Sequence, residues 1–278
     1  MQVVVGKHLV YCQSVGRGRP LFVVHGGPGL DHTYFRPWLD PLATDLQLVF
    51  SDLPGNGRSE RFPLTGGMEL WANAIEQLRV SLGADRMVLL GHSFGGYVAQ
   101  EYALRHGDRL DGLVLCCTAP AFDYGEAAKA SLQARATPEQ LAVWQAAAHA
   151  PPTDDQALRR RWTTLLPLYF AKYSPQIGAA MDAHTRYSAA AFAFAMLECL
   201  PGWSAVERLR RLRTPTLVVS GRRDLIAPIE HAGNRLQAGI DGARHLILEH
   251  SGHFPFVEEQ PAFLTGLRSW LGSLPHAH

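Results

Sequence analysis

A serine lies between two glycines in the segment Met87–Ala99, which reads Met-Val-Leu-Leu-Gly-His-Ser-Phe-Gly-Gly-Tyr-Val-Ala. An apolar run precedes Gly91-x-Ser93-x-Gly95 and a helical pattern follows it, so the spacing predicts a tight turn from a strand into a helix. Glycine on either side of the turn lets the strand and the helix approach closely, with the hydroxyl of Ser93 exposed. The pattern indicates a nucleophilic serine.

A glycine-rich helix start that binds phosphate is the alternative interpretation of the same segment. A dinucleotide fingerprint would have glycine where Ser93 stands, and a P-loop would have lysine after its last glycine. The segment has neither residue. Nucleophilic attack on a carbonyl carbon is therefore the chemistry that the segment favours.

A serine nucleophile needs a general base, and the base needs a carboxylate that orients it. After a strand–turn serine the usual chain order is serine, acid, histidine. Asp224 follows the apolar run Thr216–Gly221, at the end of a predicted strand, and is the expected acid. Asp123, which follows the run Leu110–Thr118, is the second candidate.

The expected base is His253, which lies in a loop next to Gly252 after the last predicted strand. His245 lies within that strand and His250 at its end, so we predict structural roles for both. The candidates Ser93, Asp224 and His253 all follow strand ends in the expected order.

Two glycine-rich loops follow other predicted strands. His25-Gly-Gly-Pro-Gly29 is expected to supply the N–H of Gly27 as one oxyanion donor, with the N–H of Phe94 as the other. We predict that His25 holds this loop by hydrogen bonds. In the second loop, Asp52–Ser59, turn residues are frequent, and Asp52 or Arg58 is expected to brace the site.

Short apolar runs alternate with longer helical patterns, which predicts an α/β protein with a mostly parallel eight-stranded sheet flanked by helices. The predicted strands are Val3–Val5, Leu9–Ser14, Leu21–His25, Leu46–Asp52, Met87–Gly91, Leu110–Thr118, Thr216–Gly221 and Arg244–Leu248. The predicted helices around them are Glu69–Leu82, Phe94–Arg105, His231–Ala238 and Pro261–Leu271.

Residues 119–206 depart from this alternation. They are rich in alanine and aromatic residues, are interrupted by prolines, and contain no convincing strand. We expect them to form a helical insertion after the sixth strand, leaving 1–118 and 207–278 as the α/β core.

Composition excludes several classes of protein. Apolar residues make up 47% of the 278 residues, which is too many for a disordered chain. The net charge of +1 provides no basic field for nucleic acid. The basic runs Arg159–Arg161 and Arg208–Arg213 are predicted to be solvated helix faces. The most apolar stretch, Ala189–Leu197, is too short to cross a bilayer, so we expect no membrane span.

The four cysteines are too sparse for a disulfide framework, and neither they nor the histidines have zinc-site spacing. Together with a start that lacks a signal-peptide pattern, this predicts a cytoplasmic protein that needs no metal and no cofactor. The expected partner is a small-molecule substrate, and the expected assembly is a monomer or a homodimer.

Five segments resemble the α/β-hydrolase superfamily, in an order that spans nearly the whole chain. They are His25-Gly-Gly-Pro-Gly, Asp52-Leu-Pro-Gly-Asn-Gly-Arg-Ser, Gly91-His-Ser-Phe-Gly-Gly, Gly221-Arg-Arg-Asp and Gly252-His253. The resemblance implies an α/β-hydrolase fold, a Ser93–His253–Asp224 triad and a helical cap over residues 119–206. The first segment is similar to the proline iminopeptidase group, whereas Gly-His-Ser-Phe-Gly departs from that group's Gly-Gly-Ser-Trp-Gly and is more like the esterases, lactonases and carbon–carbon-bond hydrolases.

An aminopeptidase of that group must hold the ammonium of its substrate with carboxylates, because an unpaired buried cation is costly. The candidates in the insertion are Asp123, Glu126, Asp182 and Glu198. Aromatic residues of the insertion could instead line a pocket for an apolar group. The predicted substrate-binding residues are Trp144, Tyr187, Phe194 and Glu198.

We therefore expect a serine hydrolase that cleaves a small carboxylic ester through an acyl-enzyme. The alternatives are a proline iminopeptidase-like aminopeptidase and a carbon–carbon-bond hydrolase. An alternative from another class is a hydrolase-fold receptor that binds a ligand with little turnover, because fold does not determine function.

Overall fold

The computed structural model describes residues 1–146 and 150–275. Eight strands form one sheet in the order β1-β2-β4-β3-β5-β6-β7-β8. Their bounds are β1 Gln2–Val5, β2 His8–Val15, β3 Arg19–Val24, β4 Leu46–Ser51, β5 Met87–His92, β6 Leu110–Cys116, β7 Thr216–Gly221 and β8 Arg244–Leu248.

The sheet is parallel from β4 to β8 and antiparallel only where β2 pairs with β1 and β4. The central strand β5 is buried along its whole length, as a strand with helices on both faces must be. The predicted mostly parallel eight-stranded sheet is confirmed. Strand β6 ends before the predicted Thr118 because Cys117 has a φ of 48°, which ends the extended backbone.

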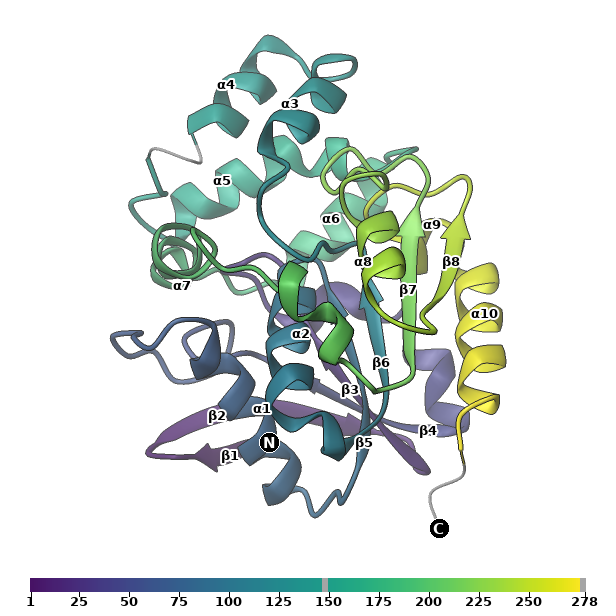
Figure 1. Ribbon diagram of the computed structural model, residues 1–278. Helices are drawn as coiled ribbons and strands as arrows, with labels where there is room; N and C mark the ends of the chain where they lie inside the picture. The colour runs from purple at the N-terminus through teal and green to yellow at the C-terminus, as the bar shows by residue number, and fades with distance from the viewer. Residues whose placement is uncertain (147–149, 276–278) are drawn as a thin grey trace.

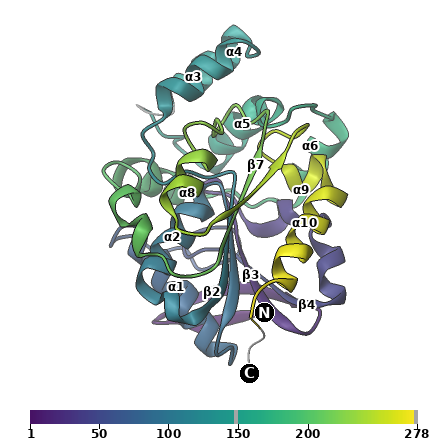
Figure 2. The same cartoon turned by 45° about the vertical axis from the view of Figure 1, so that its right-hand side comes forward.

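Helices cover both faces of the sheet (Figure 2). On one face lie α1 (Met68–Ser81), α2 (Phe94–His106) and α8 (Gly233–Gly239). On the other lie α9 (Pro255–Glu258) and α10 (Gln260–Gly272). Each face has its own apolar core, since α1, α2 and α8 share one buried cluster while α9 and α10 share the other.

The chain between β6 and β7 is helical. Its helices are α3 (Gly125–Gln133), α4 (Pro138–Ala146), α5 (Asp155–Leu165), α6 (Pro175–His184) and α7 (Ala189–Phe194). A π-helical turn, η5 (Ala195–Cys199), follows α7. Asp154, Ser174 and Ser188 cap the starts of α5, α6 and α7 by accepting backbone N–H groups.

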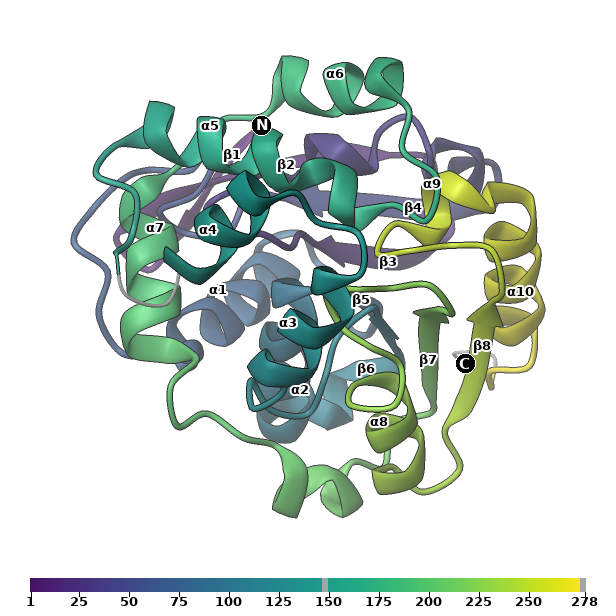
Figure 3. The same ribbon diagram turned by 90° about the horizontal axis from the view of Figure 1, so that it is seen from above.

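These helices lie over one edge of the sheet. Figure 1 shows α3 and α4, in teal, above the arrowheads of β6, β7 and β8, and Figure 3, the view from above, shows α3, α4 and α5 on the side facing the viewer. The segment therefore covers the carboxyl ends of the parallel strands, where ligands bind in open α/β sheets.

The remaining helical segments of the described chain are short 3₁₀ turns. They are η1 (His32–Phe35), η2 (Asp40–Thr44), η3 (Gly107–Arg109), η4 (Leu166–Tyr169) and η6 (Val206–Arg211). Within residues 1–146 and 150–275, no helix has both the length and the apolar character needed to span a bilayer.

Candidate active site

Ser93 lies in the turn between β5 and α2, in a strained backbone conformation. Its φ is 53° and its ψ is −119°, a region that a residue with a side chain adopts only when the surroundings enforce it. The Ser93 N–H donates to the carbonyl of Cys116 at 2.9 Å, and the Ser93 carbonyl accepts from Gly96 N–H at 2.9 Å. Gly91 permits the close approach, because a Cβ there would lie 2.7 Å from Cβ of Ala99.

His253 and Asp224 form a buried pair. The Nδ1–H of His253 donates to Oδ2 of Asp224 at 2.8 Å. The other oxygen, Oδ1, accepts the backbone N–H groups of Ile226 and Ala227 at 2.8 and 3.0 Å. Because both carboxylate oxygens have donors, Asp224 is held in one orientation and places the His253 proton on Nδ1.

The other ring nitrogen of His253, Nε2, accepts no hydrogen bond from the described residues. Nε2 of His253 is buried and has no hydrogen-bond partner among the described residues. Its lone pair is therefore available to a proton donor that enters the site. Ser93 is one residue from His92, whose ring bonds to the His253 backbone, so serine and histidine lie on adjoining loops.

The loop that carries His253 is held from two sides. The His253 N–H donates to the carbonyl of Tyr169 at 2.6 Å, and the Tyr169 ring stands edge-on to the imidazole at 5.2 Å. Gly252 N–H donates to Oε2 of Glu258 at 2.7 Å. Burial raises the pKa of Glu258 above its ordinary value. These contacts position the imidazole through its backbone.

His25 has the loop-holding role that its position predicts. Its Nδ1–H donates to the carbonyl of Gly26 at 2.8 Å, and its Nε2 accepts the N–H of Leu53 at 3.0 Å. Burial lowers the pKa of His25, which keeps the ring neutral and lets Nε2 act as an acceptor.

Two backbone N–H groups next to Ser93 are free. Gly26 N–H donates to the hydroxyl of Tyr34 at 2.6 Å. By contrast, the N–H of Gly27 has no acceptor within the described chain, and Phe94 is the first residue of α2, whose N–H has no partner inside the helix. Phe94 and Gly27 both line the cavity at Ser93. Their N–H groups are therefore free to donate to an oxygen atom of a ligand in this cavity.

The cavity at Ser93 contains about 700 Å³ of empty space when the open solvent at its mouth is included. The residues that line it are Gly27, Pro28, Ser93, Phe94, Tyr97, Phe122, Tyr124, Gly125, Ala128, Trp144, Arg161, Tyr169, Phe192, Met196, Leu200 and Ile226. Most of these side chains are apolar or aromatic, and many come from residues 119–206.

The structure places one of the four predicted substrate-binding residues at the cavity and the other three away from its lining. Trp144 lines the cavity, whereas Tyr187, Phe194 and Glu198 are not among its lining residues. The Tyr187 hydroxyl donates to Asp182 at 2.6 Å, the Phe194 ring packs into the core, and Glu198 is exposed. The sequence pattern does not tell which face of each helix meets the cavity, and this decides which of the four residues line it.

Among the described lining residues, Arg161 is the one ionised side chain. This corrects the prediction that Arg159–Arg161 is a solvated helix face. Arg159 pairs with Asp182 and Arg160 is exposed, whereas Arg161 turns inward to the ring of Phe192. The helical period would have revealed this, because Arg161 is three residues after the buried Leu158.

The candidate acidic partners for a substrate ammonium lie away from the cavity, as far as the structure describes the chain. Asp182 pairs with Arg159, Asp123 pairs with Arg235, and Glu126 and Glu198 are exposed. None of the four lines the cavity at Ser93. An ammonium group in this cavity would have no carboxylate next to it.

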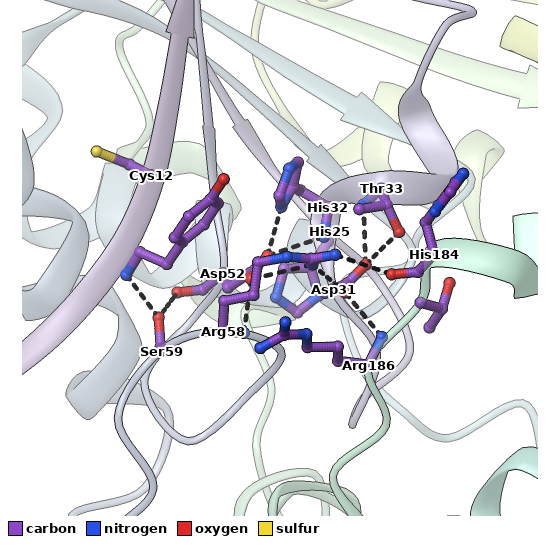
Figure 4. Close-up of polar contacts among 12 residues, drawn as sticks. Cys12, His25, Asp31, His32, Thr33, Asp52, Arg58, Ser59, His184 and Arg186 are labelled. Atoms are coloured by element: carbon purple, nitrogen blue, oxygen red, sulfur yellow. Dashed lines mark hydrogen bonds and ion pairs between the residues drawn. The ribbon is translucent and has the colours of Figure 1, made fainter. Parts of the chain in front are cut away.

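A second buried network lies between the loops after β3 and β4 (Figure 4). Oδ1 of Asp52 accepts from Nδ1–H of His32 at 2.5 Å, and its Oδ2 accepts from Arg58 N–H at 2.8 Å. Burial raises the pKa of Asp52, but the hydrogen bond and the charge of His32 outweigh it and hold that pKa below its ordinary value. This is the bracing role that the sequence predicts for Asp52.

Arg58 extends this network to the helical segment between β6 and β7. Its Nη1 pairs with Oδ2 of Asp31 at 2.5 Å, and its Nη2 donates to the carbonyl of His184 at 2.9 Å. Oδ2 of Asp31 also accepts the N–H of Arg186 at 2.8 Å. Figure 4 shows these contacts joining the core loops to the segment that follows α6.

Among the described residues, two buried groups of side chains have ligand atoms within 4.8 Å of one another, as a metal site would. They are Cys117, Asp224 and His253, and Asp31, His32 and Asp52. In the first group, the imidazole of His253 is hydrogen-bonded to the carboxylate of Asp224. In the second group, the guanidinium of Arg58 already provides a positive charge next to the two carboxylates. The existing hydrogen bonds use the atoms that a metal would need.

The sequence and the fold of the chain are similar to those of known proteins. The family model described as alpha/beta hydrolase fold matches residues 19–260. The chain is 26% identical to a proline iminopeptidase of Lactobacillus delbrueckii subsp. bulgaricus, over 96% of this chain and 95% of that protein. A thermophilic esterase from Thermogutta terrifontis superposes with a TM-score of 0.78 at 25% identity, covering 98% of both chains. The enol-lactonase from Burkholderia xenovorans LB400 superposes with a TM-score of 0.79 at 22% identity, covering 98% of this chain and 100% of the other.

Proposed function

The chain belongs to the alpha/beta hydrolase fold family, and from that premise we propose that it is a serine hydrolase that cleaves a small carboxylic ester. The observation that carries the proposal is the state of His253. Asp224 holds its Nδ1–H, while its Nε2 is buried without a partner among the described residues, beside the loop of Ser93. This is the arrangement that a general base for a serine hydroxyl requires.

In the proposed reaction the hydroxyl oxygen of Ser93 forms a bond to the ester carbonyl carbon, and its proton moves to Nε2 of His253. The N–H groups of Phe94 and Gly27 stabilise the oxyanion that forms. The carbon–oxygen bond to the leaving alcohol then breaks, and His253 returns the proton to that alcohol. Water attacks the acyl-enzyme by the same route and regenerates Ser93.

We assign substrate enclosure to residues 119–206, as a cap on a core made of 1–118 and 207–278. Trp144, Phe192 and Met196 from this segment line the cavity. Their apolar surfaces favour a substrate with an apolar body and exclude water from the reacting carbonyl.

A proline iminopeptidase-like activity is the second candidate, and the 26% identity to such an enzyme favours it. The absence of acidic side chains from the described cavity lining favours the ester instead. A carbon–carbon-bond hydrolase is the third candidate activity. A ligand receptor with little turnover is a further outcome that the experiment below distinguishes from an ester or amide hydrolase.

The test compares native protein with Ser93→Ala, with Ser273→Ala as the control because Ser273 is exposed at the end of α10. We expect a fluorophosphonate probe to label the native protein and Ser273→Ala but not Ser93→Ala. We also expect p-nitrophenyl butyrate to be cleaved faster than prolyl-naphthylamide. Labelling that does not depend on Ser93 would refute the serine hydrolase, labelling without turnover would favour the receptor, and faster cleavage of the prolyl amide would favour the aminopeptidase.

A further inference from the structure

Arg161 faces the cavity because of its position on α5. It lies three residues after Leu158 and four before Leu165, and both leucines are buried on the inward side of the helix. Residues at these spacings share one helix face. The Arg161 side chain lines the same cavity as Ser93, whereas Arg160, one residue earlier, is exposed.

The guanidinium of Arg161 has no acidic partner in the part of the chain that the structure describes. Within residues 1–146 and 150–275, no carboxylate oxygen lies within the 4.0 Å of an ion pair from it. The remaining residues, 147–149 and 276–278, are alanine and histidine, so they cannot provide a carboxylate side chain. The neighbouring Arg159 differs, because Asp182 neutralises it.

The surroundings of Arg161 are apolar and aromatic. Its Cζ lies 5.5 Å from the centroid of the Phe192 ring, a cation–π contact. Among the other lining residues, Tyr97 and Tyr124 are hydrogen-bonded to each other at 3.0 Å. Burial lowers the pKa of Arg161 from its ordinary value, as expected for a cation that has lost part of its hydration. A half-buried guanidinium that has no carboxylate partner among the described residues is a site for an anion.

We propose that Arg161 binds a carboxylate of the substrate, so that the protein prefers an ester that carries a negative charge at a distance from the scissile carbonyl. The fork of a guanidinium matches a carboxylate with two parallel hydrogen bonds, and the apolar walls strengthen them. The same positive charge repels a substrate ammonium. The inference rests on the proposed function, since it names the substrate class of the same site.

The kinetic test uses two pairs of esters, one with the carboxylate on the acyl group and one with it on the leaving group. The first pair is mono-p-nitrophenyl glutarate and p-nitrophenyl pentanoate, and the second is 4-carboxyphenyl butyrate and phenyl butyrate. In Arg161→Gln we expect kcat/KM for the anionic ester of at least one pair to fall about tenfold to a hundredfold, with the neutral ester within about twofold of native. Arg160→Gln, one residue earlier on α5, is the matched control. It should leave the ratio of kcat/KM for the anionic ester to kcat/KM for the neutral ester unchanged in both pairs.

An anionic-to-neutral ratio that Arg161→Gln leaves unchanged in both pairs would overturn the inference. A binding measurement separates this failure from failure of the proposed function. We expect calorimetry to show that Ser93→Ala protein binds 4-phenylbutyrate about tenfold or more tightly than 4-phenylbutanamide, and that adding Arg161→Gln removes the difference. Equal binding of the two would also overturn the role of Arg161, whereas the absence of all Ser93-dependent turnover with this preference intact would contradict only the proposed hydrolase.

Discussion

The ring Nε2–H of His92 donates a hydrogen bond to the backbone carbonyl of His253 at 2.8 Å. Since a carbonyl can only accept, the proton of His92 is on Nε2, and its Nδ1 accepts from the hydroxyl of Tyr34 at 2.8 Å. The Tyr34 oxygen in turn accepts the N–H of Gly26 at 2.6 Å. One series of hydrogen bonds with a single direction therefore joins the loop after β3, the turn of Ser93 and the loop of His253.

Tyr34→Phe removes two of these three hydrogen bonds, the one from Gly26 N–H and the one to Nδ1 of His92. We expect kcat for p-nitrophenyl butyrate to fall about tenfold with KM little changed, because Gly26 N–H loses its acceptor and His92 its donor. Steady-state kinetics measures both constants. Tyr173→Phe is the control, since Tyr173 lies outside the cavity lining. If kcat of Tyr34→Phe equals that of the native protein, these hydrogen bonds do not position the site.

The burial of His92 makes stability depend on pH. Burial, and then the charge of His253, lower the pKa of His92 well below its ordinary value. The unfolded chain thus takes up a proton below about pH 6.5 that the native protein does not, so stability is lost as pH falls, by about 1.4 kcal/mol per pH unit for this one group.

His92→Gln keeps an amide donor for the His253 carbonyl but has no titrating ring. We expect the free energy of unfolding to fall more steeply for native protein than for His92→Gln between about pH 6.5 and pH 5. Urea unfolding at several pH values measures the two slopes. Parallel curves would show that His92 does not cause the pH dependence.

Gly26→Ala places a methyl group against the nucleophile. Its Cβ would lie 2.8 Å from Cβ of Ser93 and 3.2 Å from Oη of Tyr34. We expect the loop or the serine to shift and kcat/KM to fall about a hundredfold, the loss seen when an oxyanion donor is misplaced. Gly272→Ala, where a Cβ would meet nothing within 4 Å, should keep native activity. Equal activity of the two variants would refute the close approach.

Asp31→Asn tests the attachment of the helical segment to the core. Asp31 is fully buried and holds Arg58 and the N–H of Arg186, so the loss of its charge leaves Arg58 poorly paired. We expect a loss of about 2 kcal/mol in the free energy of unfolding by urea. Glu249→Gln removes an exposed pair with Arg222 and should cost less than about 1 kcal/mol. A similar loss in the two variants would contradict the bracing role.

Local sequence was sufficient for the fold class and for the turn at Ser93. Strands buried on both faces are continuous apolar runs, and the glycine spacing around Ser93 is needed wherever a strand and a helix meet so closely. The order of Ser93, Asp224 and His253 at strand ends also follows from local pattern, and the structure pairs Asp224 with His253.

Tertiary structure decided which other side chains surround the serine. Tyr34 and Tyr169 reach the site from 3₁₀ turns that no motif marks. The helical period sets Arg161 apart from Arg160, but only the packing of α5 brings the face of Arg161 to the cavity of Ser93. Likewise the aromatic residues of the insertion have similar patterns, yet Trp144 lines the cavity and Phe194 packs in the core. The physical reason is that periodicity defines the faces of a helix, whereas contacts between distant segments determine what each face meets.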